Sequence, residues 1–166
     1  MTYAQITLGK GQTYYGQVNS ATRQRQGRGT IMWDDKSTFE GFWLADKANG
    51  RGRMIFADGS IYEGNWIDGR QNGYGVFSSI EGIKYNGNWQ ENLQHGKGEE
   101  EWPDGTKYAG DFVKGQKTGK GLFSWPDGST YQGAVVDSKF QGFGVYTWAL
   151  EGRVYSGQWN RSRMHG

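Results

Sequence analysis

The sequence predicts an all-β protein built as an elongated solenoid of stacked antiparallel hairpins, with no helices of note. Two observations predict this class. Glycine supplies 29 of the 166 residues and aromatic residues 16%, whereas proline occurs only twice. The motif aromatic-x-Gly also recurs about every 23 residues, beginning at Tyr14, Phe39, Tyr62, Tyr85, Tyr108, Tyr131 and Tyr155. A period of this length is typical of an array in which each unit packs on its neighbours.

Each unit reads as two strands joined by a polar loop. In "YEGNW" (62–66) the side chains of Tyr62, Gly64 and Trp66 share one face, because side chains alternate along a strand. The loop "IDGRQN" follows, and then a return strand on which Gly73 and Gly75 are expected to share that face with the next aromatic residue. Asp-Gly pairs at 58–59, 104–105 and 127–128 mark the turn into the next unit. We call the face that carries the rings the ring face, and the opposite one the back face.

The second glycine motif, Gly-x-Gly, gives the glycines a physical role. It occurs at 27/29, 50/52, 73/75, 96/98, 119/121 and 142/144. Rings from both strands cannot face one another across strands about 5 Å apart unless small residues leave room for them. Burying a ring stabilises the fold by about 1.5–3 kcal/mol, which exceeds the roughly 0.5–1 kcal/mol that a glycine costs a strand. We therefore expect about thirteen strands whose core is made of rings packed on glycines.

These motifs resemble the MORN ("membrane occupation and recognition nexus") repeat. The match is close in "YEGNWIDGRQNGYG" (62–75) and "YNGNWQENLQHGKG" (85–98), and it covers residues 14–166 as six complete units and a partial seventh. Residues 1–13 then form an N-terminal cap. The resemblance implies a twisted, grooved sheet of hairpins. It also implies a role in holding together cytoskeletal, ciliary or membrane-associated assemblies.

Some units depart from this pattern. The tryptophan place holds Val18, Phe112 and Val135 in units one, five and six. Ring packing on the first strand should be thinnest at Val135. Unit four carries Glu99, Glu100 and Glu101 where other units are apolar, which puts Glu100 on the ring face. An open sheet with a solvated Glu100 is the favoured interpretation, and a gap that receives a partner's basic group is the alternative.

The sequence shows no catalytic, cofactor or metal motif. The chain lacks cysteine and has a net charge of +2, and it begins without an apolar signal-like segment. His95 and His165 occupy polar loop-end places, and Asp58, Asp104 and Asp127 belong to turns. We therefore expect a protein that is not an enzyme and that acts inside the cell, in the cytoplasm, at the cytoskeleton or in a cilium, with association with a membrane as a further option.

Two sets of residues are candidate contacts for a partner. One is on the ring face and comprises Trp33, Trp102, Trp125 and Trp148. The other is a row of basic residues between the paired glycines, on the back face, comprising Arg28, Arg51, Lys97 and Lys120. Each set has a plainer interpretation, namely structural packing for the tryptophans and a solvated face that prevents aggregation for the basic row. The Glu99–Glu101 run completes the candidate site.

The favoured function is a scaffold or adaptor that binds protein partners. The alternatives are a tether that binds anionic lipid through the basic row, and a targeting segment of a larger enzyme. Nucleic acid is disfavoured as a partner, because the rings hold periodic core places and do not form a free stacking platform. Self-association through an open end of the solenoid stays open as well.

Overall fold

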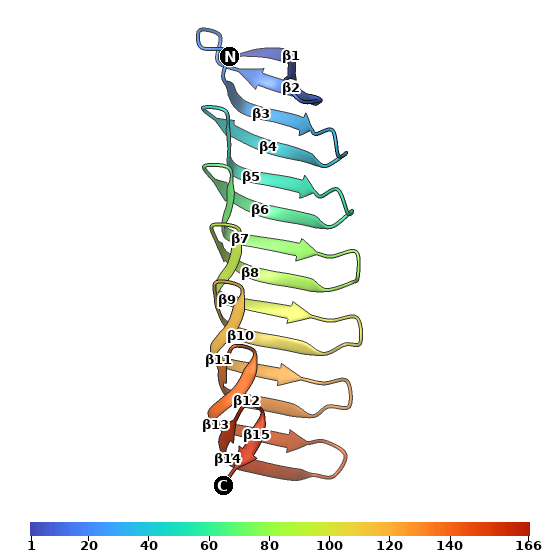
Figure 1. Ribbon diagram of the computed structural model, residues 1–166, viewed down its shortest axis with the longest axis vertical. Helices are drawn as coiled ribbons and strands as arrows, with labels where there is room; N and C mark the ends of the chain where they lie inside the picture. The colour runs from blue at the N-terminus through green and yellow to red at the C-terminus, as the bar shows by residue number, and fades with distance from the viewer. The chain divides into compact units, whose positions relative to one another are not determined.

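The computed structural model describes residues 1–166, and every regular element in it is a strand. The predicted all-β class and the stacked hairpins are confirmed (Figure 1). The strands number fifteen, rather than about thirteen, because residues near both ends also pair. The strands are β1 (Thr2–Leu8), β2 (Gln12–Val18), β3 (Arg25–Met32), β4 (Thr38–Leu44), β5 (Lys47–Ile55), β6 (Ile61–Ile67), β7 (Arg70–Ser78), β8 (Lys84–Gln90), β9 (Leu93–Glu101), β10 (Lys107–Val113), β11 (Gln116–Ser124), β12 (Thr130–Val136), β13 (Lys139–Trp148), β14 (Arg153–Asn160) and β15 (Arg163–His165).

The residues group into two compact units. The N-unit comprises residues 1–80 and 89–92, and the C-unit comprises residues 81–88 and 93–166. Within each unit, every strand pairs antiparallel with its neighbours in the chain, and the strand order is the chain order. The register places glycine opposite glycine: Gly64 faces Gly52 on one side and Gly75 on the other. Each unit is thus a meander with glycines in register across it.

The hairpins close through tight turns, so the expected six-residue loop is wrong. Strand β6 ends at Ile67 and β7 begins at Arg70, which leaves only Asp68 and Gly69 between them. Both turn residues have positive φ, 50° and 81°, as a type I′ hairpin turn requires. The remaining residues are absorbed as a bulge, because the register shifts between Gly64 and Trp66.

The first glycine of each Gly-x-Gly pair creates this bulge. Gly73 has φ +84°, and a Cβ built on it would lie 3.5 Å from the Cβ of Asn65, a back-face residue. The expectation that Gly73 shares the ring face with Gly75 is therefore wrong. The left-handed conformation reverses the alternation at this point, and glycine adopts it without the strain that a side chain adds.

The second glycine of the pair has the predicted role of leaving room for a ring. A Cβ on Gly75 would lie 2.5 Å from Cε2 of Tyr62 and even closer to its hydroxyl oxygen. A Cβ on Gly64 would lie 2.7 Å from the same hydroxyl oxygen. The Tyr62 ring thus lies flat over both glycines, and its hydroxyl donates a hydrogen bond to the Asn65 carbonyl at 3.0 Å. The tyrosines at 14, 85, 108, 131 and 155 repeat this bond.

Tryptophans join one hairpin to the next. The Trp66 ring packs edge-on against Tyr62 of its own repeat, with ring centroids 5.3 Å apart, and against Phe39 of the preceding repeat at 4.9 Å. Its Nε1 donates to the Gly52 carbonyl at 3.2 Å. The turn adds a further link, because the Gly69 amide donates to the Ala48 carbonyl at 2.8 Å. Edge-to-face ring contacts contribute about 0.5–1.5 kcal/mol each beyond burial, so the ring row is a main source of stability.

We predict that Gly75→Ala destabilises the protein by about 2 kcal/mol or more, because the added methyl group collides with the Tyr62 ring. Gly9→Ala is the matched control: no atom lies within 4 Å of its added Cβ, so its effect should stay within about 0.5 kcal/mol. Urea denaturation measures both changes. Equal stability of the two variants would contradict the packing of the ring on Gly75.

We also predict that stability falls between pH 10 and 12. Burial raises the pKa of Tyr62 to about 12, and it raises the pKa of Tyr108 to about 12 as well. In the unfolded chain tyrosine ionises near pH 10, so the folded state holds these protons longer. The stabilisation is complete below pH 10 and is lost as pH rises to 12.

Denaturation at several pH values tests this prediction. The double variant Tyr62→Phe, Tyr108→Phe should show a flatter decline, and Phe39 shows that phenylalanine is accepted at this place. A wild-type unfolding free energy that stays constant from pH 10 to 12 would contradict it.

Candidate binding groove

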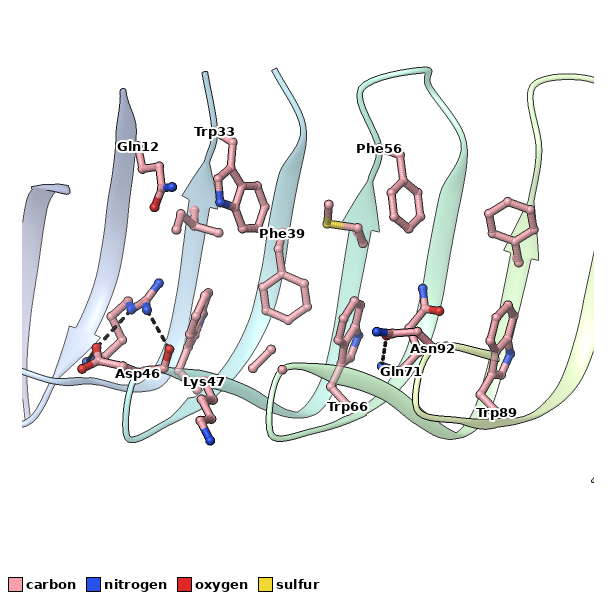
Figure 2. A pocket seen from close by; sticks show the side chains of 17 residues that line it. Gln12, Trp33, Phe39, Asp46, Lys47, Phe56, Trp66, Gln71, Trp89 and Asn92 are labelled. Carbon is pink, nitrogen blue, oxygen red and sulfur yellow. Dashed lines mark hydrogen bonds and ion pairs between the residues drawn. The ribbon is translucent and has the colours of Figure 1, made fainter. Parts of the chain in front are cut away.

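The ring face of the N-unit carries a groove of about 750 Å³ (Figure 2). Two rows of rings form its sides. Trp43, Trp66 and Trp89 come from the ends of β4, β6 and β8, and Trp33, Phe56 and Phe77 follow or end β3, β5 and β7. Ile31, Met54 and Phe39 also line the groove, as does Ala48, which lies opposite Trp43 in the register. The lining is therefore apolar along its centre, as is typical of sites that bind apolar groups.

Polar residues bound the groove at one end. The Arg25 guanidinium lies 4.4 Å from the Trp43 ring centroid and donates to a carboxylate oxygen of Asp46 at 3.1 Å. It also donates to the Asp46 carbonyl at 2.6 Å. Because the guanidinium is paired with Asp46 and also lies over the Trp43 ring, Arg25 is held in place and closes this end of the groove. Gln12 and Lys47 are the other polar residues near it.

Gln71 is a polar residue inside the groove. Its side chain lies between Trp66 and Trp89 in Figure 2, and the residue is 6% exposed. Its backbone amide donates to Asn92 Oδ1 at 2.9 Å, and its carbonyl accepts from the Asn92 amide at 3.0 Å. The side-chain carboxamide, by contrast, makes no hydrogen bond within the chain. No side-chain nitrogen or oxygen of the chain is both fully buried and without a partner, so the carboxamide of Gln71 reaches the open side of the groove.

The predicted tryptophans fall into different surroundings. Trp33 lines the groove of the N-unit. The other three belong to the C-unit and are half-buried against their own neighbours. Trp102 lies 4.7 Å from the Lys117 ammonium, Trp125 packs at 5.3 Å on Tyr146, and Trp148 packs at 4.5 Å on the same tyrosine.

The first strand carries no ring at Val135, as predicted, but the return strand fills the ring face at this place. Phe140, opposite Val135 in the register, stacks on Tyr131 with centroids 3.7 Å apart and planes 7° from parallel. The neighbouring strand thus supplies the ring that Val135 lacks. This exchange is possible because Val135 leaves the face of Tyr131 uncovered.

The interpretation of Glu100 as solvated is wrong as well. Its side chain is 11% exposed, and its carboxylate accepts from the Lys117 ammonium at 2.8 Å. Lys117, 13% exposed, also lies 5.7 Å from the Tyr108 and Phe112 rings. The chain therefore supplies its own basic group here, and that removes the reason for expecting one from a partner. Glu99 and Glu101 lie on the exposed side, where Glu101 pairs with Lys107 at 3.6 Å.

The basic row lies on the back face, in company with acidic side chains. Arg28 approaches Glu40 at 3.9 Å in the N-unit, where Arg51 lines the same shallow hollow. In the C-unit Lys97 pairs with Asp111, and Lys120 lies across a hollow of about 550 Å³. The hydrogen bond from Lys97 and the backbone amide of Lys120 hold the pKa of Asp111 below its usual range. The row is thus a mixed-charge surface and not a uniformly basic strip.

The remaining candidates have structural contacts. His95 Nδ1 accepts a hydrogen bond from the Lys114 amide at 3.4 Å, and Asp58 accepts one from the Ser60 amide at 2.8 Å. No group of three or more His, Cys, Asp or Glu side chains is placed to hold a metal ion. The chain contains no helix that is long and apolar enough to cross a membrane.

Sequence reasoning missed one repeat position, which we call the groove position: the residue two places before each Gly-x-Gly pair. Its members are Arg25, Ala48, Gln71, Gln94, Lys117 and Phe140. A signal was present in the aligned repeats. Arg25 and Phe140 occur in the two units where valine replaces tryptophan, and Lys117 occurs in the unit where phenylalanine does.

Fold and groove together define a protein made of β-hairpin repeats that presents one grooved face of rings. A family model for the MORN repeat matches residues 39–61, 62–82, 85–107, 108–130, 131–149 and 155–166, so the chain belongs to the MORN repeat family. A comparison with curated proteins finds no match.

Two solved structures are similar to this chain at low sequence identity, and the first shares its fold. One is the SAS-4 (dCPAP) TCP domain of Drosophila melanogaster, in complex with a proline-rich motif of Ana2 (dSTIL). It is 12% identical over 94% of this chain and 90% of that chain, with a TM-score of 0.52. Another is the TCP10 domain of Danio rerio CPAP, in complex with a STIL peptide. It is 13% identical over 93% of this chain and 77% of that chain, with a TM-score of 0.46.

We predict that Glu100→Gln destabilises the protein by about 2 kcal/mol, because it leaves the Lys117 ammonium without its carboxylate. The double variant Glu100→Met, Lys117→Gln installs the residues that Met54 and Gln71 provide at the corresponding places. We expect its stability to be within about 1 kcal/mol of the wild type. Urea denaturation measures the stability of both variants. A double variant less stable than Glu100→Gln would contradict the prediction, because it would show that the Glu100–Lys117 pair stabilises the fold beyond cancelling the two buried charges.

Proposed function

We propose that this protein is a non-enzymatic scaffold or adaptor, and that the groove of its N-unit binds a polypeptide segment of a partner. The observation that carries the proposal is the groove itself: apolar rings along a trough of about 750 Å³, with the carboxamide of Gln71 set among them. Apolar lining with few, well-placed polar groups suits a ligand that is apolar but carries amide groups. An extended peptide has this composition.

Comparison with solved structures supports the same conclusion. The Drosophila TCP domain, which shares the fold, is in complex with a proline-rich motif. A protein of this fold can therefore bind a polypeptide segment. For the cellular setting, we propose that the scaffold acts in an assembly at the cytoskeleton, in a cilium or at a membrane.

The lipid tether and the targeting segment of a larger enzyme stay as alternatives. The back face favours lipid less than the sequence suggested, because Arg28 and Lys97 each approach an acidic side chain. Sedimentation with anionic vesicles at low and high salt measures this activity. Salt-sensitive binding that Arg51→Glu, Lys120→Glu abolishes would favour the tether.

Selection from a phage-displayed library of 12-residue peptides tests the proposed function. We expect the intact protein to select peptides that bind with Kd values in the micromolar range or below. Trp33→Ala should weaken the selected peptides by about 10-fold or more, because it removes a ring from the groove. Trp148→Ala in the C-unit is the matched control and should leave binding unchanged. A library that yields no binding peptide would overturn the proposal.

A further inference from the structure

The back face of the C-unit carries a hollow of about 550 Å³, which we call the back hollow. Its floor is a strip of three glycines, Gly110, Gly121 and Gly133, which lie opposite one another on β10, β11 and β12. Because these residues have no side chains, the floor is bare backbone. The backbone of a bound segment can therefore approach it closely.

Two rows of side chains flank the glycine strip. One row is uncharged: Ala109 lies opposite Leu122, which lies opposite Gln132. In the other row Lys120 lies opposite Ala134, and Phe143 follows on β13. Leu122 is 37% exposed and Phe143 57% exposed, so both present apolar surface to solvent. The back hollow thus combines apolar walls with a lysine.

The same place in the N-unit is covered by charged side chains. The residues equivalent to Ala109, Leu122 and Gln132 by their places in the repeat are Glu40, Arg53 and Glu63, which also lie opposite one another. Long side chains of opposite charge attract across a sheet and fill the space above it. The hollow left among them measures about 250 Å³. The C-unit therefore opens, and makes apolar, a place that the N-unit closes.

Lys120 brings an unpaired positive charge to the back hollow. Asp111 is satisfied by others, because it pairs with the Lys97 ammonium and accepts a hydrogen bond from the Lys120 backbone amide at 2.9 Å. The Lys120 ammonium forms no ion pair within the chain. An unpaired ammonium beside apolar surface is complementary to a ligand that carries a carboxylate next to an apolar group.

We propose that the back hollow is a second binding site, and that it takes an acidic polypeptide segment of a partner. The carboxylate of the segment pairs with Lys120, and a large apolar side chain packs between Leu122 and Phe143. Lys120 and Phe143 are two strands apart, about 10 Å, which roughly three residues of extended chain span. The acidic and the apolar residue of the segment are therefore at most three positions apart.

Gln132 favours a polypeptide over other anions. Its exposed carboxamide makes no hydrogen bond within the chain, so it can donate to and accept from a peptide group of the segment. A lipid acyl chain offers no such group. The inference goes beyond the proposed function, which concerns the groove of the N-unit. A chain with both sites can hold two partners, as an adaptor must.

A subtractive selection tests the inference with a phage-displayed library of 12-residue peptides. The blocking variant Ala109→Glu, Leu122→Arg, Gln132→Glu installs the row that the N-unit carries in this place. Phage that bind this variant are discarded, which removes ligands of the groove, and the remainder are selected on the wild-type protein. Calorimetric titration measures Kd, and circular dichroism verifies that each variant is folded.

We expect the selected peptides to share an acidic residue with a large apolar residue at most three positions away. The blocking variant should weaken their binding by at least about 20-fold. Lys120→Met, which keeps the aliphatic stem and removes the charge, should weaken it by about 5-fold. Lys139→Met is the matched control at an exposed lysine outside the back hollow, and it should change nothing.

Three results would overturn the proposal: no peptide survives the subtraction, the survivors lack a common acidic residue, or they bind Lys120→Met as tightly as the wild type. If no peptide survives while Lys120→Met abolishes sedimentation with phosphatidylserine vesicles, the site belongs to lipid instead. Trp33→Ala should leave the selected peptides unaffected, so failure here leaves the groove of the N-unit untouched.

Discussion

The contact on which the fold depends is the flat packing of one aromatic ring over two glycines that face each other across a strand pair. Any side chain at the second glycine would enter the Tyr62 ring, so the register of each hairpin is fixed to the position where the two glycines meet. With the ring held flat, its hydroxyl reaches the carbonyl three residues on, and its edges are left for tryptophan. Register, hydrogen bonding and ring order thus follow from a single steric requirement.

That requirement also explains how successive hairpins are joined. A tryptophan needs a ring edge in its own unit and another in the unit before, and its indole nitrogen needs the glycine carbonyl that the flat ring leaves accessible. Each hairpin alone would satisfy half of these contacts, which is why a single hairpin of this kind is marginal and an array is stable. Phe112 keeps the ring contacts without the indole hydrogen bond, so the ring edge is the more general part of the joint.

The parts of the structure that sequence predicts are those where one residue type has one role. The aromatic-x-Gly motif and the Gly-x-Gly pair recur because every copy meets the same steric demand, and the hairpins were predicted from them. No single residue type recurs at the groove position, because its side chains make different contacts: Arg25 pairs with Asp46, Lys117 pairs with Glu100, and Phe140 stacks on Tyr131. Their partners lie in the next hairpin or across it, so spacing within one repeat could not reveal the Glu100–Lys117 pair or the stacking of Phe140. The bulge was missed because a left-handed glycine reverses the face of every residue before it.

Variation at the groove position is compatible with an unchanged fold because its backbone and its side chain have separate roles. The carbonyls of Arg25, Ala48 and Gln71 each accept a hydrogen bond from the turn of the next hairpin, whatever side chain they carry. The side chain points into the ring face, where Arg25 closes one end of the groove and Gln71 presents a carboxamide. At the two extremes the pair compensates in size, because Ala48 lies opposite Trp43 and Phe140 lies opposite Val135. In a repeat that looks degenerate by motif, such as the one with Val135, a side chain of the return strand therefore fills the ring face from within.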